Sequence, residues 1–191
     1  MLIGVIGKSG AGKSSLIEKI ARLDRSIIHI DIDKVWAEVI QDKSVIDNVV
    51  KIACDSSILT NGKLDRYKTG NIIFSNKNKY EQYYSYIEGI IYSVIDKIII
   101  ENSDKKIFLD WIILDKTKYW SNLDYKILVD TDYECRKNRV IEREKISEEY
   151  FDLREMMKDD YSLENIDLIV KGNNIEDKLI KEILGEINGK E

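Results

Sequence analysis

Apolar residues along this chain cluster in short runs that alternate with longer stretches of mixed polarity. The short runs are nearly continuous and rich in isoleucine and valine, as expected for parallel strands covered on both faces. In the longer stretches the apolar positions recur with the period of a helix. This alternation predicts an α/β fold with a five-stranded parallel sheet. The predicted strands are residues 2–6, 27–32, 106–109, 125–129 and 167–170.

The predicted helices are distributed unevenly between these strands. Residues 33–102 form a stretch of roughly 70 residues without a good strand, far more than the dozen or so that a crossover between parallel strands needs. We interpret this stretch as a helical insertion that supplies a second substrate pocket. The charged segment 136–162 is predicted to be a further helical excursion and a candidate lid. The predicted helices are residues 13–23, 33–41, 43–54, 65–74, 77–101, 132–143, 147–160 and 175–187.

Composition narrows the class of protein. The 191 residues, 43% of them hydrophobic, are enough for one core, so a single domain is expected. Acidic and basic residues are interspersed with a net charge of -5, which argues against a nucleic-acid partner. No apolar run approaches the roughly 18 residues of a membrane span, and no signal peptide is visible. Cys54 and Cys135 fit no metal or redox motif, so we expect buried free thiols and a cytoplasmic location. We expect a monomer or weak oligomer.

A glycine-rich segment follows the first predicted strand and matches the pattern G-x-x-x-x-G-K-[ST]. Its backbone N–H groups are expected to bind phosphate oxygens at the start of a helix. In such a loop the lysine reaches the β and γ phosphates of ATP, and the next hydroxyl holds Mg²⁺. A plain turn between strand and helix is the alternative, but it would need neither the lysine nor so many glycines. The predicted nucleotide-binding residues are Gly7, Lys8, Ser9, Gly10, Ala11, Gly12, Lys13, Ser14 and Ser15.

The phosphate loop alone does not separate kinases from GTPases or motor ATPases. Guanine-specific proteins of this class carry N-K-x-D at a strand end. The nearest segment here, Asn76 to Lys79, lacks the aspartate and lies in a predicted helix. A GTPase is therefore disfavoured.

Two aspartates end the second predicted strand, at the edge of the sheet where ligands bind in open parallel sheets. Asp31 or Asp33 is well placed to orient an attacking hydroxyl group. Asp33 is equally suited to cap the helix that follows, and the two roles are compatible. The single histidine, His29, alternates within the apolar strand, and we interpret it as a packing residue outside the site. Asp110, at the end of the third strand, is predicted either to help hold Mg²⁺ or to cap the strand end.

Together with the phosphate loop, four further segments resemble the dephospho-CoA kinase family over residues 1–187. They are "IDIDK" (30–34), "NGKLDRYKTGNIIF" (61–74), "RVIEREKISEE" (139–149) and "DLIVKGNN" (167–174). The resemblance implies a P-loop fold like that of nucleoside monophosphate kinases, with a core (1–42, 103–135 and 163–191), an acceptor subdomain (43–102) and a lid (136–162). It implies transfer of the γ-phosphoryl group of Mg·ATP to the 3′-hydroxyl of dephospho-CoA, in coenzyme A biosynthesis.

The resemblance also assigns roles to individual residues. It implies that Asp33 is the catalytic carboxylate, that Arg66 lies with the acceptor, and that Arg139 and Arg143 are lid arginines that close on the phosphates. Asn173 falls in the loop that lies against the adenine of ATP. Without the family, Arg139 and Arg143 are an i,i+4 pair on a solvated helix face.

The departures from the family pattern lie in segments that the family uses for the acceptor. Glu88-Gly89 stands where the family usually has His-Pro, and residues 111–115 lack its Pro-Leu-Leu-x-Glu. We therefore place Glu88 among the substrate-binding residues, with Asp31, Asp33 and Arg66. Two alternatives stay open: a kinase for another nucleotide-like acceptor, such as a nucleoside monophosphate, and an ATP-binding regulatory relative without transfer activity.

Overall fold

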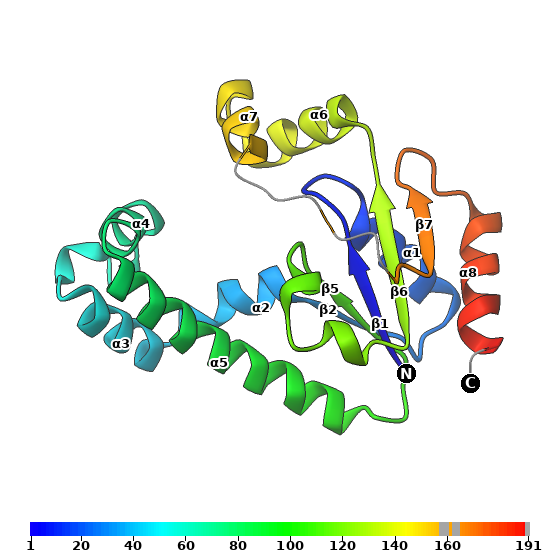
Figure 1. Cartoon of the computed structure of the whole chain (residues 1–191), viewed down its shortest axis with the longest axis horizontal. Helices are drawn as coiled ribbons and strands as arrows, with labels where there is room; N and C mark the ends of the chain where they lie inside the picture. Colours follow the sequence, from blue (N-terminus) through cyan, green and yellow to red (C-terminus); the bar gives the residue numbers. More distant parts are fainter. Residues whose placement is uncertain (157–160, 162–164, 190–191) are drawn as a thin grey trace. The chain divides into compact units, whose positions relative to one another are not determined.

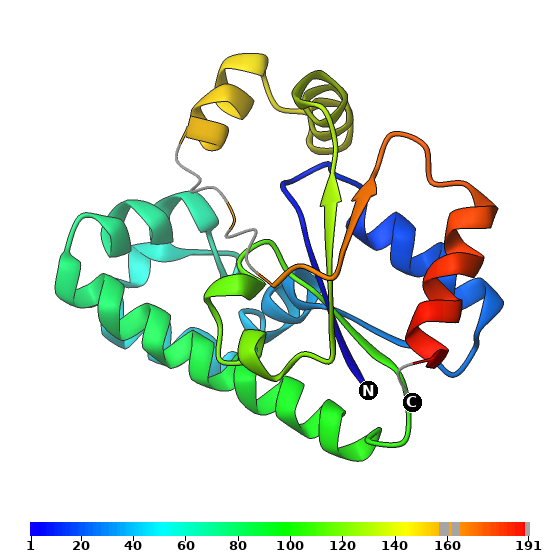
Figure 2. The same cartoon turned by 45° about the vertical axis from the view of Figure 1, so that its right-hand side comes forward.

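The five predicted strands form one parallel sheet in a computed structural model that describes residues 1–156, 161 and 165–189 (Figures 1 and 2). The strand order is β2-β5-β1-β6-β7, so the phosphate loop, which follows β1, leaves the middle of the sheet. In register, Val5 and Asp31 each pair with Asp110, which brings three strand ends to one edge. The strands are β1 (Leu2–Ile6), β2 (Ile28–Asp31), β5 (Ile107–Asp110), β6 (Tyr125–Asp130) and β7 (Leu168–Lys171).

The sheet belongs to a compact unit that comprises residues 1–31 and 102–191. Helices α1 (Lys13–Leu23) and α8 (Asp177–Gly189) lie side by side on one face of the sheet, as Figures 1 and 2 show. Apolar side chains of these helices, such as Ile17 and Ile183, pack against strand residues such as Val5 and form a buried core. After the C-terminal end of β6, the chain forms α6 (Tyr133–Glu144) and α7 (Glu148–Met156).

Residues 32–101 form a second compact unit, which is mostly helical. Its longest helix, α5 (Lys77–Glu101), contacts each of the other three helices. Ile87, Ile91 and Ile95 are buried at four-residue intervals along α5, as expected for the apolar face of a helix. The other helices are α2 (Ile32–Val39), α3 (Lys43–Ala53) and α4 (Arg66–Phe74).

The helical unit departs from the sequence prediction in its strands. Residues 33–102 were predicted to hold no good strand, but β3 (Leu59–Thr60) and β4 (Lys63–Leu64) form a short antiparallel hairpin. Asn61 and Gly62 connect them, both with positive φ (53° and 75°). This is the two-residue Asn-Gly turn that favours a hairpin, a signal that the prediction overlooked.

Other boundaries shift by a few residues for identifiable reasons. Ile32, predicted as the end of a strand, begins α2, and residues 32–42 group with the helical unit because α2 packs against α5. Residues 157–160 of the predicted helix 147–160 lie outside the described residues. The prediction of buried thiols is wrong: Cys54 is exposed at the C-terminal end of α3, and Cys135 is only partly buried. Within the described part, no helix combines the length and the apolar character that crossing a membrane requires.

Candidate active site

The phosphate loop connects β1 to α1 and leaves the start of that helix open. Gly12, which precedes the first helical residue, has φ 103° and ψ 16°, a left-handed conformation that favours glycine. Gly12 has no side chain that could cap the first turn, and this turn contains no acidic residue. The N–H groups and the positive end of the helix dipole are therefore available to an anion.

Behind the loop, Lys13 and Ser14 converge on the carboxylate of Asp110. The Ser14 hydroxyl donates to Asp110 Oδ2 at 2.7 Å, and Lys13 Nζ lies 3.6 Å from Oδ1. Lys13 Nζ also donates to the carbonyl oxygen of Gly7 at 3.1 Å. A lysine and a serine from the loop and an aspartate from the neighbouring strand thus form one connected cluster.

The environment of Asp110 keeps it ionised although its side chain is only 4% exposed. Burial alone would raise the pKa of this carboxyl group. The hydrogen bond from His29, the charge of Lys13 and the hydroxyl of Ser14 outweigh burial and hold the pKa below its usual value. An ionised carboxylate beside a serine hydroxyl offers the hard oxygen ligands that suit a divalent cation such as Mg²⁺.

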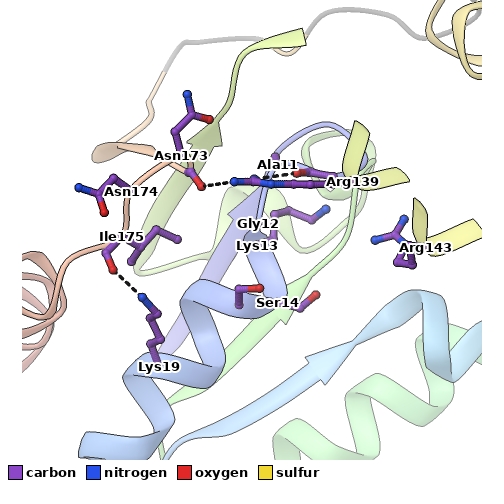
Figure 3. Close-up of a pocket in the computed structure, with 13 residues that line it drawn as sticks. Ala11, Gly12, Lys13, Ser14, Lys19, Arg139, Arg143, Asn173, Asn174 and Ile175 are labelled. Carbon is purple, nitrogen blue, oxygen red and sulfur yellow. Dashed lines mark hydrogen bonds between the residues drawn. The ribbon is translucent and has the colours of Figure 1, made fainter. Parts of the chain in front are cut away.

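A cavity of about 500 Å³ opens in front of this cluster (Figure 3). Its walls come from the phosphate loop and α1, from α6, and from the loop after β7. Its volume falls in the range typical of small-molecule sites. The lining residues are Gly10, Ala11, Gly12, Lys13, Ser14, Ser15, Lys19, Arg139, Arg143, Gly172, Asn173, Asn174 and Ile175.

Two arginines of α6 line this cavity but make different contacts. Arg139 donates to the carbonyl oxygens of Gly10 and Gly172, both at 3.2 Å, and Figure 3 shows it extended between the phosphate loop and the loop after β7. Arg143 donates to Ser9 Oγ at 3.3 Å and to the carboxylate of Glu144 at 2.6 Å. Both arginines predicted to belong to the lid therefore line the cavity, and Arg139 bridges its two walls.

The loop after β7 touches the phosphate loop directly at Gly172. A Cβ atom on Gly172 would lie 2.0 Å from the carbonyl oxygen of Ala11 and 2.3 Å from Thr131 Oγ1, so no other residue fits without displacing backbone. The Thr131 hydroxyl donates to the same Ala11 carbonyl at 2.7 Å. Asn173, the next residue, is hydrogen-bonded to Asp132.

The structure brings together most of the predicted nucleotide-binding residues. Gly10 to Ser15, Arg139, Arg143 and Asn173 line the same cavity. Gly7 and Ser9 do not line it but hydrogen-bond to Lys13 and Arg143, which do. Lys8 lines a second cavity, of about 610 Å³, formed with residues of β6 and β7.

The predicted acceptor residues are divided between the two units. Asp31 ends β2 and pairs in register with Asp110. In the helical unit, exposed Asp33 lies in the first turn of α2, and Arg66 is the first residue of α4. Glu88, in α5, accepts a hydrogen bond from the Tyr92 hydroxyl within the same helix.

Sequence reasoning missed the place of His29. Its Nε2 lies 3.3 Å from Asp110 Oδ2, so the histidine interpreted as a packing residue contacts the central carboxylate of the site. Alternation along β2 puts His29 on the same face as Asp31. The contact itself depends on the pairing of β2 with β5, for which the sequence holds no direct signal.

Comparison with known proteins gives a consistent result. The model of the dephospho-CoA kinase family matches residues 1–176. The chain is 26% identical over 185 residues to the dephospho-CoA kinase of Fusobacterium nucleatum, covering 96% of this chain and 95% of that protein. It is 29% identical over 154 residues to the dephospho-CoA kinase of Aquifex aeolicus, covering 80% and 77% of the two chains.

Solved structures show the same fold. The crystal structure of TT1252 from Thermus thermophilus matches with a TM-score of 0.81 at 17% identity, over 100% of this chain and 97% of that one. The dephospho-CoA kinase from Campylobacter jejuni matches with a TM-score of 0.57 at 20% identity, over 99% and 96% of the chains.

Proposed function

The chain belongs to the dephospho-CoA kinase family, and we propose that it transfers the γ-phosphoryl group of ATP to the 3′-hydroxyl of dephospho-CoA. The resemblance recognised in the sequence motifs is confirmed by this membership. The observation that supports the proposal most directly is the cluster of Lys13, Ser14 and Asp110 at an uncapped helix start beside a cavity of about 500 Å³.

The donor phosphates bind at the start of α1. Backbone N–H groups of residues 12–15 surround the β phosphate, and Lys13 exchanges its hydrogen bond to the Gly7 carbonyl for phosphate oxygens. The adenine lies toward Asn173, in the part of the cavity formed by the loop after β7. These groups neutralise the charge of the triphosphate and fix its orientation.

The oxygen ligands at the loop fit Mg²⁺. Ser14 and the ionised Asp110 are the residues that would hold it, with phosphate oxygens completing the set. When bound there, Mg²⁺ would supply positive charge that offsets the negative charge of the phosphates. Ser14 donates its own proton to Asp110, which leaves the serine lone pairs free for the cation.

Asp33 accepts the proton of the attacking hydroxyl. The 3′-oxygen then forms a bond to the γ-phosphorus, while the bond from that phosphorus to the β–γ bridging oxygen breaks and ADP leaves. Arg143 and Arg139 stabilise the transferring group through their guanidinium N–H donors. Closure of α6 and α7 over the phosphates excludes water, which suppresses hydrolysis of ATP.

In the proposed reaction Asp31 and Arg66 are assigned to the acceptor, and Glu88 stands where the family usually has a histidine. A carboxylate there disfavours a phosphate and favours a hydroxyl or amide group of the acceptor, because like charges repel.

Turnover with purified protein tests this function. ADP release is measured with Mg·ATP and dephospho-CoA, and then with nucleoside monophosphates and other nucleotide-like acceptors at equal concentration. We expect dephospho-CoA to give the highest kcat/KM and a product phosphorylated at the 3′ position. A faster reaction with any other acceptor would reassign the substrate, and ATP binding without any transfer would show a regulatory relative.

A further inference from the structure

We propose that His29 is a positioning residue that orients the Asp110 carboxylate for its work at the phosphate loop. The proposal rests on the function proposed above, in which Ser14 and Asp110 hold the divalent cation. His29 itself touches neither substrate nor cation in this scheme. It acts through Asp110, which it contacts from the neighbouring strand β2.

The geometry around Asp110 supports this role. Oδ2 accepts the Ser14 hydroxyl at 2.7 Å and lies 3.3 Å from His29 Nε2, while Oδ1 faces Lys13 at 3.6 Å. Ser14 and Lys13 come from the first turn of α1, and His29 comes from the strand β2. An ionised carboxylate only accepts hydrogen bonds, so the imidazole nitrogen that faces it is the donor.

The backbone fixes His29 in this position. In the parallel pair β2–β5, His29 is opposite Phe108 and Asp31 is opposite Asp110, so His29 reaches Asp110 diagonally along the same face. Its side chain is 18% exposed and that of Asp110 is 4% exposed, so little water can replace the imidazole. A residue that served packing alone would not need a donor atom at this point.

The bond has a direct consequence for Ser14. With His29 in place, the carboxylate plane is held between two donors, and Oδ2 stays directed at the serine hydroxyl. Without the imidazole donor, the carboxylate is free to turn toward Lys13, and the Ser14 proton loses its fixed acceptor. Partners that orient metal ligands in this way typically change metal affinity by about 10–100-fold when they are removed.

Calorimetry of ADP binding tests the role without any acceptor. The dissociation constant of ADP is measured with Mg²⁺ and again with EDTA, for the parent chain and for His29→Leu, His29→Gln and Tyr125→Phe. Glutamine places an amide donor near the position of Nε2. Tyr125→Phe is the matched control, because it removes a hydrogen bond between β6 and Glu186 of α8, in the same unit and away from the loop.

We expect His29→Leu to reduce the Mg²⁺-dependent gain in ADP affinity by about tenfold, with the affinity in EDTA unchanged. His29→Gln should restore most of the gain, and Tyr125→Phe should leave it intact. An equal loss in Mg²⁺ and in EDTA, or no loss in either, would overturn the proposal. These outcomes are independent of dephospho-CoA turnover, so failure of the proposed acceptor would be recognised separately.

A spectroscopic measurement on the parent chain tests the hydrogen bond without relying on the folding of the His29 variants. Since His29 is the sole histidine, long-range proton–nitrogen correlation of the labelled chain reports one imidazole only. We expect Nε2 to carry the proton in the parent, and its signal to move in Asp110→Asn. An imidazole that carries its proton on Nδ1 alone would contradict the hydrogen bond and with it the proposal.

Discussion

Helix α1 and helix α3 begin in opposite ways, although a lysine is the first residue of both. Before Lys13 stands Gly12, which has no side chain to cap the turn. Before Lys43 stands Asp42, whose carboxylate accepts from the N–H groups of Ser44 and Val45. In α4 the arrangement of α3 recurs, since Asp65 accepts from the second and third N–H groups of that helix.

The difference shows what each helix start is for. An aspartate cap satisfies the N–H groups within the chain and brings a negative charge to the positive end of the helix, which stabilises the helix. A glycine in the same place leaves both the donors and the positive potential for an external anion. The aspartates therefore stabilise the starts of α3 and α4, whereas the start of α1 is left for the phosphate that we propose it binds.

The largest effect is expected from Lys13→Ala, with Lys43→Ala as its control. Lys13→Ala removes a charge that meets the transferring phosphates, so kcat/KM should fall by about 10²–10³-fold. Lys43→Ala, at the same position of a capped helix, is the control and should leave kcat/KM unchanged. The steady-state rate of ADP release measures both. Similar losses in the two variants would remove the distinction between the helix starts.

Placing an aspartate before α1, as in α3, should abolish phosphate binding at the start of α1. Gly12→Asp places a like charge at the phosphate site and strains a backbone with φ 103°, so ATP affinity should fall by about 10²-fold or more. Gly62→Asp is the control for strain, since φ is 75° there and a Cβ would meet no atom within 4 Å. ATP binding is measured by calorimetry. If Gly12→Asp bound ATP as the parent does, the open helix start would have no role in binding.

Asp33, in the first turn of α2, could serve the reaction or the stability of the helix, and one substitution distinguishes the two roles. If it accepts the hydroxyl proton, Asp33→Asn should lower kcat by about 10²-fold while ATP affinity and the thermal midpoint change little. If it only stabilises the first turn of α2, the thermal midpoint should fall by about 2 °C and kcat should be kept. Paired measurements of kcat and of unfolding by circular dichroism distinguish these results, and we expect the first.

The smallest effect concerns a cap alone. Asp42→Ala should lower the thermal midpoint by about 2–4 °C at neutral pH without changing kcat. The hydroxyl of Ser44 and the N–H groups of Ser44 and Val45 hold the pKa of Asp42 below its usual value. The cap therefore contributes fully above pH about 4 and is lost as the pH falls through this lowered pKa. Urea midpoints of parent and variant should converge as the pH is lowered below about 4, and a constant difference would contradict the role of the charge.

Local signals in the sequence were enough for most of the fold. Strands and helices followed from apolar periodicity, and helix α1 was predicted with the bounds that the structure shows, Lys13–Leu23. The missed hairpin carries its signal in two adjacent residues, Asn61 and Gly62, and was hidden by the helical character of its surroundings. Ile32 was misassigned because an apolar residue after a strand looks the same whether it ends the strand or begins a helix.

In the site, too, contiguous residues were predictable from the sequence, whereas contacts between distant segments were not. The phosphate loop was predictable because its residues are contiguous and their spacing is fixed by the turn they form. The contact of His29 with Asp110 joins residues 81 positions apart, through a strand pairing that apolar strands do not specify individually. The place of Arg139 between Gly10 and Gly172 is likewise a property of three segments together, and only the family resemblance pointed to it.

Gly172 also bears on how this protein can change over generations. A Cβ atom on Gly172 would lie 2.0 Å from the Ala11 carbonyl oxygen, so even a methyl group has no room. A substitution there would push on the loop proposed to bind phosphate, although the residue itself belongs to the segment proposed to face the base. Mutational drift in that segment is therefore constrained at Gly172 by the phosphate loop, and variation in nucleotide preference is expected to arise at Asn173 and Asn174 instead.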